Sequence, residues 1–183
     1  MESAFFDERA ATWDEDPAKV ERSAVVADAI VASVSISSAT RMLEYGAGTG
    51  LVTQALRDHV GPVTLADSSE GMRAVVQAKI DAGTLTDARI WALDLATEAP
   101  PHEQFDLIVT VMALHHIVDL DHEDGSFHGE GFAGHHGFRR PELAHQLAAA
   151  GFGETTFQDC HEMVRDGVPY TVFLAVASPH AES

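Results

Sequence analysis

The chain has 183 residues, a single cysteine (Cys160) and a formal net charge of −18 at pH 7. This length predicts one domain with one hydrophobic core, and a lone cysteine excludes an internal disulfide and a cysteine-built metal site. The negative charge would repel phosphate backbones, so we expect no nucleic acid partner. The sequence shows no apolar run near the ~20 residues of a membrane span and no signal peptide pattern at its acidic start, so we expect a cytoplasmic protein.

The first 16 residues combine aromatic side chains, Phe5, Phe6 and Trp13, with acidic ones. A frayed amphipathic start is one interpretation, and a second follows from a resemblance given below. Pro17 suits the first turn of a helix. Apolar residues then recur near helical period, at Val20, Val25, Ala29, Ile30 and Val34. We expect this helix to pack on a face of the sheet without a chemical role.

Glycines alternate at Gly46, Gly48 and Gly50, directly after a short apolar run that ends in Glu44. A strand, a glycine-rich turn and a helix form the nucleotide-binding corner of doubly wound α/β domains. Glycine permits backbone angles that a Cβ disfavours and lets a ligand approach the main chain. The start of the next helix adds unpaired N–H groups.

The glycine spacing separates two classes of ligand. A dinucleotide fingerprint is G-x-G-x-x-G, whereas here the third glycine comes one residue earlier and Glu44 stands two residues before the first. The pattern E-x-G-x-G-x-G resembles the first motif of class I S-adenosylmethionine (SAM) dependent methyltransferases. The resemblance implies that Glu44, Gly46, Ala47, Gly48 and Gly50 bind SAM, with the acid facing the ammonium of its methionine end. A carboxylate suits a cation there better than a pyrophosphate.

The N-terminal segment FDERAATWDE resembles the lid of small-molecule methyltransferases related to quinone-biosynthesis C-methyltransferases. This resemblance implies that Trp13 and its neighbours help to close over the cofactor.

The second expected strand, 63–66, ends at Asp67, ~20 residues after the first glycine, where such folds hold ribose hydroxyls. A carboxylate can accept hydrogen bonds from both hydroxyls of a vicinal diol. The alternative is that Asp67 caps the next helix, 70–81, but Ser68 or Ser69 is available for that. We place Asp67 and Ser68 at the cofactor. The resemblance puts Met72 against adenine, and packing in the core explains Met72 equally well.

The third expected strand, 88–93, leads to Asp94 and Leu95. In the family that the chain resembles, an Asp here accepts a hydrogen bond from the adenine amino group, and the next backbone N–H reaches a ring nitrogen. The fourth strand, 105–111, is almost continuously apolar, as expected of a central parallel strand covered on both faces. It ends at Met112 and Ala113, whose backbone, by the same resemblance, lines the methionine end of SAM.

Two histidines follow, His115 and His116. Adjacent helical positions differ by about 100°, so one of them faces a site, and we favour His116 as a contact to the methyl acceptor. If the acceptor must lose a proton, His116, His135 or His136 is the candidate base. The histidines match no compact metal-ligand spacing, so we expect no metal.

The chain departs from the family after His116, because the helix and strand that usually follow are missing. A parallel neighbour of the fourth strand needs a crossover of about a dozen residues, and residues 112–117 are too few. The outer edge of that strand must therefore stay bare, pair with the C-terminal hairpin or be covered by another chain. We expect either the C-terminal hairpin or a second copy of the chain, as a homodimer, to cover it.

The C-terminal part predicts a helix that starts near Pro141 and ends at Gly151, then strands at 154–162 and 170–177 joined through Asp166-Gly167. The expected fold is α/β and doubly wound Rossmann-like, with a mostly parallel sheet and a C-terminal antiparallel hairpin, one strand and one helix short of the usual seven-stranded form. We expect one domain, 1–183. Its parts are a lid and helix (1–36), a SAM-binding core (37–117) and a truncated substrate-side half (118–183).

The expected function is SAM-dependent methyl transfer to a small molecule. One alternative is a non-catalytic SAM-binding remnant, because the missing elements belong to the acceptor side. The other is an NAD(P)-dependent reductase, which the glycine spacing and the lack of a Tyr-x-x-x-Lys pair disfavour.

Overall fold

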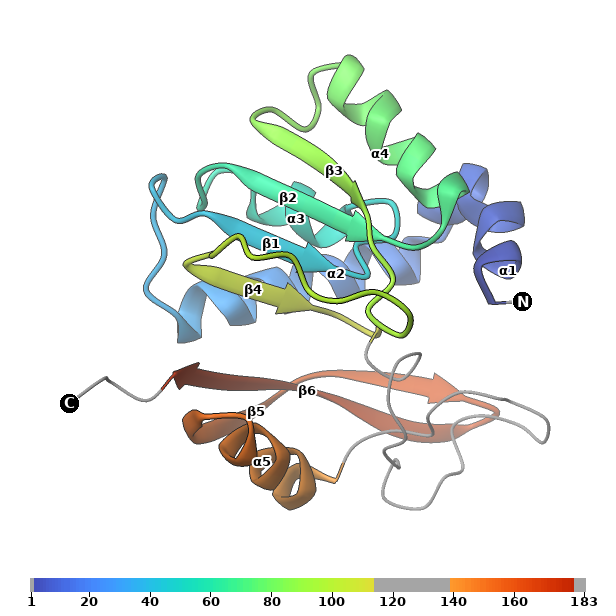
Figure 1. Ribbon diagram of the computed structural model, residues 1–183. Coiled ribbons are helices and arrows are strands. Elements are labelled where there is room, and N and C mark those ends of the chain that lie inside the picture. Colours follow the sequence, from blue (N-terminus) through green and yellow to red (C-terminus); the bar gives the residue numbers. More distant parts are fainter. Residues whose placement is uncertain (1, 114–138, 180–183) are drawn as a thin grey trace. The chain divides into compact units, whose positions relative to one another are not determined.

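The computed structural model describes residues 2–113 and 139–179 (Figure 1). The chain clusters into two compact units, Met1–Leu114 and His115–Ser183, and each is described by itself. In the described parts, no helix is long and apolar enough to cross a membrane. The expected homodimer, like the division of the chain into three functional parts, stays a prediction.

The first unit alternates helices and strands, as the sequence predicted. A helical N-terminal segment precedes the sheet: α1 (Glu2–Arg9), the 3-10 helix η1 (Ala10–Glu15) and α2 (Pro17–Ser33). The remaining elements are β1 (Met42–Tyr45), α3 (Leu51–Leu56), β2 (Val63–Asp67), α4 (Glu70–Asp81), β3 (Ala88–Ala92) and β4 (Leu107–Thr110).

Helix starts follow the capping signals in the sequence. Asp16 caps α2 by accepting a hydrogen bond from the Ala18 N–H, with Pro17 in the first turn. Ser69, not Ser68, caps α4, since its hydroxyl accepts a hydrogen bond from the Met72 N–H at 3.1 Å. Asp67 is therefore not the helix cap, as expected.

The four strands form one parallel sheet in the order β3-β2-β1-β4. Met42 of β1 pairs with Val63 on one side and Leu107 on the other, so β1 is central. Because all strands run the same way, their carboxyl ends meet at one edge, on the side of α1 and the start of α4 (Figure 1). In doubly wound sheets, ligands bind at this edge.

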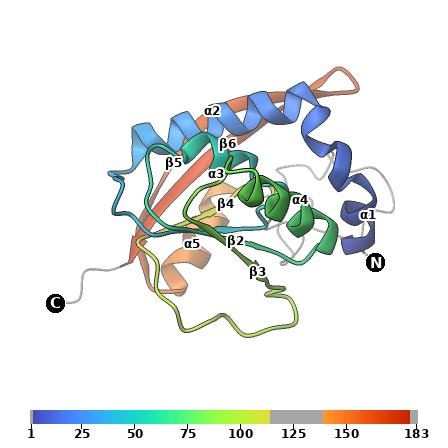
Figure 2. The same cartoon turned by 90° about the horizontal axis from the view of Figure 1, so that it is seen from above.

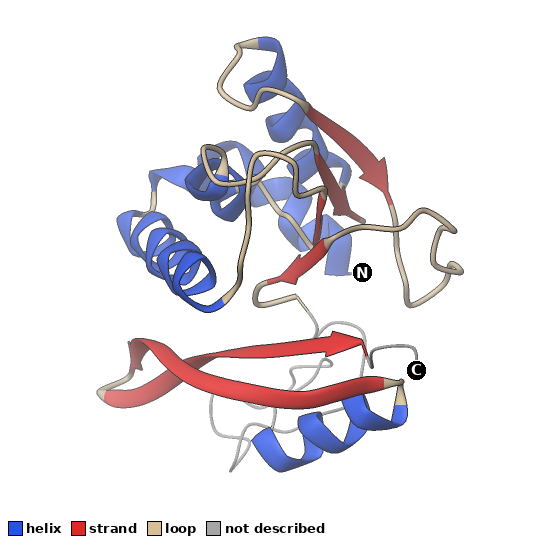
Figure 3. Cartoon of the chain, turned by 90° about the vertical axis from the view of Figure 1, so that its left-hand side faces the viewer, coloured by secondary structure: helices blue, strands red, loops and turns tan. Residues whose placement is uncertain are grey.

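Helices α2, α3 and α4 pack on one face of this sheet (Figures 2 and 3). The core between them is apolar and well buried, with Met42, Leu56, Leu65, Met72 and Val76 each at most 1% exposed. The link from β3 to β4 contains no helix. Ile108 of β4 is 62% exposed, which differs from the expectation that the fourth strand is covered on both faces.

The second unit consists of α5 (Arg140–Ala149), β5 (Phe152–Arg165) and β6 (Val168–Pro179). The two strands pair antiparallel and α5 packs against β5. The turn between them is Asp166-Gly167, with φ of +52° and +79°, as the hairpin signal predicted. The Rossmann-like fold with a parallel sheet and a C-terminal antiparallel hairpin is thus confirmed.

Strand β4 is an outer strand of the four-stranded sheet, and the hairpin is a separate two-stranded sheet. The expectation that the hairpin covers the outer edge of β4 concerns two separate units and stays a prediction. The residues between Ala113 and Arg139, which include the expected fusion point at 118–120, lie outside the described ranges.

Candidate functional site

The glycine-rich loop after β1 is a tight left-handed turn. Gly46, Gly48 and Gly50 have φ of +68°, +54° and +77°, values that side-chain-bearing residues rarely adopt. The Gly46 and Ala47 amides donate to the carbonyl of Ala66 at 2.8 and 3.1 Å, and the Gly50 amide donates to the carbonyl of Ala47 at 2.8 Å. The loop is thereby fastened to the end of β2.

The three glycines meet different surroundings. A Cβ on Gly46 would lie 2.1 Å from the Cβ of Ala113, and one on Gly50 would lie 2.8 Å from Cδ2 of Leu65. Both glycines are needed for packing. A Cβ on Gly48 would meet nothing within 4 Å. The main chain at Gly48 therefore borders open space, where a ligand can approach it closely.

Asp67 at the end of β2 connects the loop with the start of α4. One of its carboxylate oxygens, Oδ2, accepts from the Gly48 amide at 2.7 Å, and the other, Oδ1, accepts from the Ser69 amide at 2.8 Å. Each oxygen has a second lone pair. Asp67 is half-buried, so it can hold the loop and still accept hydrogen bonds from two ligand hydroxyls.

Glu44 lies in the centre of β1 and is 2% exposed. Its Oε2 accepts from the Thr53 amide at 3.0 Å and from the Thr53 hydroxyl. Burial raises the pKa of Glu44 to about 7, although the hydrogen bonds from Thr53 act in the opposite direction. In this structure Glu44 anchors α3 to the sheet. The expectation that it faces a ligand ammonium stays a prediction.

Asp94 and Leu95 follow β3, as predicted, and both form hydrogen bonds within the protein. The Asp94 carboxylate accepts from the Ala96 amide at 3.0 Å, and the Leu95 amide donates to the Tyr45 hydroxyl at 3.1 Å. Tyr45 was not singled out in the sequence. Burial raises its pKa, which keeps the hydroxyl protonated. The Leu95 amide would have to exchange this partner for an adenine nitrogen.

Met112 and Ala113 follow β4 at the same edge of the sheet. Met112 has φ +56° and is 39% exposed. A residue with a side chain in the left-handed region is uncommon and marks strain that often accompanies function. The turn places Ala113 directly against Gly46. By contrast, Met72 is 1% exposed. It packs in the core, as one of its two predicted roles requires, and its contact with adenine stays a prediction.

The N-terminal segment contributes two aspartates that sequence reasoning missed. Asp7 accepts hydrogen bonds from the Ser69 hydroxyl and the Gly71 amide at 2.6 and 2.8 Å. Asp14 forms an ion pair with Lys79, with its Oδ2 2.7 Å from Nζ. Both acids lie in the same FDERAATWDE segment as Trp13 and are seven residues apart, a near-helical period that could have indicated one shared face.

Two other predicted cofactor residues, Trp13 and Ser68, contact residues outside the glycine-rich loop. Trp13 is half-buried, with the Phe6 ring 5.8 Å away between centroids and the Lys19 ammonium 4.1 Å from its ring centroid. Ser68 is exposed, and its carbonyl accepts from Arg73 at 2.7 Å. The predicted catalytic histidines, His116 and His135, lie outside the described residues. Within the described ranges no group of three or more His, Cys, Asp or Glu could hold a metal ion.

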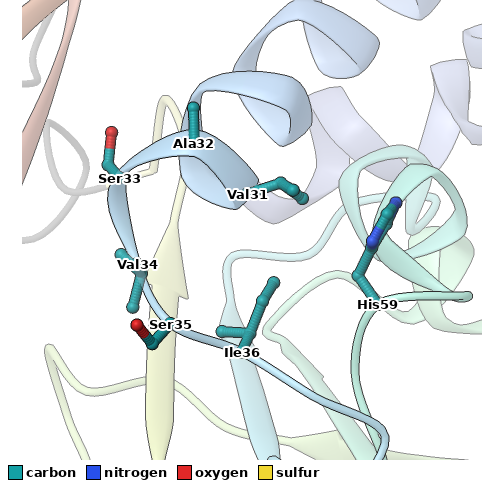
Figure 4. Close-up of a pocket in the computed structure, with 7 residues that line it drawn as sticks. All are labelled: Val31, Ala32, Ser33, Val34, Ser35, Ile36 and His59. Atoms are coloured by element: carbon teal, nitrogen blue, oxygen red, sulfur yellow. The ribbon is translucent and has the colours of Figure 1, made fainter.

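An open depression lies at the other end of the sheet, where α2 ends and the chain leads to the amino end of β1 (Figure 4). It contains none of the predicted cofactor-binding or catalytic residues, so it is not the candidate site. Its lining residues are Val31, Ala32, Ser33, Val34, Ser35, Ile36 and His59.

Comparison with known families agrees with this geometry. Residues 42–126 match the model of the family described as "Methyltransferase domain". The match covers slightly less than half of the chain, which is similar to this family over these residues. The match begins at the first residue of β1 and includes the glycine-rich loop, Asp67 and the Asp94-Leu95 pair.

Two curated relatives are similar in sequence to about half of the chain. The chain is 31% identical over 97 residues to an uncharacterized methyltransferase from Anoxybacillus flavithermus, covering 53% of this chain and 43% of that protein. It is 32% identical over 93 residues to the biotin biosynthesis bifunctional protein BioCD from Bordetella avium, covering 50% of this chain and 19% of that protein. The chain thus spans less than half the length of these relatives.

Solved structures extend the likeness over nearly the whole chain. The DhpI–SAH complex has a TM-score of 0.68 at 20% identity, covering 97% of this chain and 94% of that chain. The DhpI–SAM–HEP complex has a TM-score of 0.70 at 21% identity, covering 97% of each chain. At this identity the likeness shows the fold alone. It also shows that a solved chain of nearly this length has this fold.

Proposed function

We propose that the chain binds SAM at the carboxyl edge of its parallel sheet and transfers the methyl group to a small molecule. The main observation behind the proposal is that four amides of the glycine-rich loop already donate hydrogen bonds within the protein. Those of Gly46, Ala47 and Gly50 donate to backbone carbonyls, and that of Gly48 donates to the Asp67 carboxylate. A pyrophosphate needs such amides as free donors and is repelled by a carboxylate. A sulfonium nucleoside needs no free amide donors from the loop, and its positive charge is not repelled by a carboxylate.

The residues present fit such a ligand. The open space beside Gly48 admits a close approach to the main chain, and Asp67 would accept from the two ribose hydroxyls. Asp94 would accept from the adenine amino group, and the backbone of Met112 and Ala113 would lie along the methionine end. The named complexes of DhpI with SAM and SAH, which share the fold, support this assignment.

The chemistry asks little of the protein beyond alignment. Bound SAM supplies a methyl group that its sulfonium charge already activates. The loop and Asp67 then orient the nucleoside, and the surrounding residues exclude water and hold the acceptor in line. A base is needed only if the acceptor must lose a proton. We propose His116 or His135 for that role. We also infer that the acceptor is a small molecule, because the net charge of −18 repels nucleic acid.

Calorimetry with SAM and with NADH tests the cofactor class directly. We expect a binding isotherm with SAM and none with NADH, and heat with NADH alone would refute the proposal. Turnover of labelled SAM with a pool of metabolites then separates a working enzyme from a non-catalytic SAM-binding remnant, because the remnant would bind the cofactor without losing the label.

Gly48→Ala tests the site with little effect on the fold. A Cβ there meets nothing in the protein, so the change costs about 1–2 kcal/mol of backbone strain, yet the methyl group would enter the proposed ligand space. We expect SAM affinity to fall at least about tenfold. Gly83→Ala is the matched control, because Gly83 also has positive φ (+75°) and open surroundings but lies in the turn after α4. Equal SAM affinity in both variants would remove the loop from the site.

A further inference from the structure

The N-terminal residues 2–15, here called the strap, comprise α1 and η1 and pack against α4. The strap lies beside the start of α4, at the end of the sheet where the strands terminate (Figure 1). Two aspartates attach it to the elements that form the proposed SAM site. The attachments join residues that are 35 to 65 positions apart in sequence.

The first attachment is Asp7. Its Oδ1 accepts from the Ser69 hydroxyl at 2.6 Å and from the Gly71 amide at 2.8 Å. These contacts lie in the first turn of α4, whose positive end favours a carboxylate. The hydrogen bonds from Ser69 and Gly71 lower the pKa of Asp7, so this attachment is charged and in place at neutral pH.

The second attachment is Asp14, which reaches the glycine-rich loop itself. Its carboxylate accepts from the Thr49 hydroxyl and pairs with the Lys79 ammonium, which also donates to the Thr49 carbonyl at 2.9 Å. Thr49 is 1% exposed and sits between Gly48 and Gly50. Asp14 and Lys79 therefore hold this loop residue at both its side chain and its backbone.

The strap lies in direct backbone contact with α4 at Gly71. A Cβ on this glycine would lie 2.8 Å from Cα and 2.9 Å from the carbonyl oxygen of Asp7. The backbone of Gly71 is helical, so an alanine there would not strain α4. Its added methyl group would nevertheless collide with the strap. Gly71 thus offers a way to lift the strap without weakening the domain.

We propose that the strap clamps the glycine-rich loop, with Asp14 and Lys79 as positioning residues for SAM binding. When it is attached, Thr49 is fixed and the backbone at Gly48 is held ready for the ligand. The role in retaining SAM rests on the proposed function, but the attachment does not. By linkage, a ligand that orders the loop must also tighten the strap.

Hydrogen–deuterium exchange of the full chain without ligand tests the clamp by itself. In Gly71→Ala and in Asp14→Ala, we expect at least about tenfold faster exchange in residues 2–15, and in Asp14→Ala also in residues 46–50. Glu8→Ala and Glu15→Ala are matched controls, because both acids are exposed neighbours in the strap, and we expect them to exchange like the wild type. The sheet amides of 63–67 report on global unfolding and should stay protected. Unchanged strap exchange in both variants would overturn the proposal.

The second measurement is the dissociation of labelled SAM during a chase with unlabelled SAM. We expect about tenfold faster dissociation from Gly71→Ala and Asp14→Ala than from the wild type and the two controls. Faster strap exchange with unchanged dissociation would overturn the clamp and leave the strap a packing element. If the wild-type chain binds no SAM, the proposed function fails, and the exchange experiment still decides whether the strap holds the loop.

Discussion

Replacing Asp67 by alanine is expected to lower the affinity for SAM by at least about a hundredfold. In the proposed complex the carboxylate accepts from two ribose hydroxyls, and hydrogen bonds to a charged group contribute about 1.5–3 kcal/mol each. Together they correspond to two to four powers of ten in the dissociation constant. Calorimetric titration with SAM measures the change directly.

Asp67 also holds the Gly48 and Ser69 amides, so the test must separate ribose binding from loop positioning. A SAM analogue that lacks both ribose hydroxyls does this. It should bind the wild type much more weakly than SAM does, whereas the alanine variant should bind both equally. Asp58→Ala removes an exposed carboxylate elsewhere and should leave the affinity unchanged. An alanine variant that keeps the wild-type affinity would remove the ribose assignment.

Local signals explain why much of the fold could be predicted. The glycine spacing, the cap at Ser69 and the hairpin turn at Asp166-Gly167 each act within a few residues, and each occurs where expected. The helix after the loop ends at Leu56, within two turns of its start. There the Arg57 side chain turns back to the carbonyl of Val60 at 2.7 Å, a contact that helical periodicity does not encode.

The missed parts of the site are contacts between distant segments. The Tyr45 hydroxyl meets the Leu95 amide across 50 residues, and Asp7 meets Ser69 across 62. Neither pair has a characteristic spacing, because the parallel sheet brings Tyr45 and Leu95 together, and the packing of α1 on α4 brings Asp7 to Ser69. The sequence named Asp67 and Leu95 correctly as edge residues. It could not show that their hydrogen-bonding groups already have partners within the protein.

For Glu44 too, the sequence could not show which group within the protein is its hydrogen-bond partner. Its position before the glycines indicated a special role, and its burial in the centre of β1 agrees with one. Its partner, Thr53, is nine residues further along the chain, on the opposite side of the loop. Sequence reasoning considered a ligand as the partner, since nothing in the spacing shows that α3 turns Thr53 toward the strand.

Glu44→Gln is expected to make the stability of the chain less dependent on pH. The pKa of Glu44 is about 7 in the folded chain, against 4.5 as its ordinary value. Between these values the folded state keeps a proton that the unfolded state has lost, so the wild type loses stability as pH rises. The full loss is about 3 kcal/mol, at about 1.4 kcal/mol per pKa unit. A glutamine has no proton to lose, so the variant does not undergo this loss of stability.

Urea unfolding at pH 4.5, 6 and 8 measures this effect. Relative to the wild type, the glutamine variant should gain about 3 kcal/mol between the first and last pH. Glu21→Gln, an exposed change on α2, should show a flat difference. A Glu44→Gln difference that does not change with pH would mean that folding leaves the pKa of Glu44 unshifted, and one that falls as pH rises would mean that the folded chain stabilises the carboxylate as an anion. The raised pKa would then be wrong.

The same variant decides whether Glu44 faces the ammonium of SAM. A cation beside the carboxylate lowers its pKa, so binding of SAM near pH 6, where Glu44 is largely protonated, should release up to about one proton. Calorimetry in two buffers of different ionisation enthalpy detects that release, and the glutamine variant should show none from this site. Binding without proton release from the wild type would instead restrict Glu44 to holding Thr53 and the start of α3 in place, with the positive end of the ligand elsewhere.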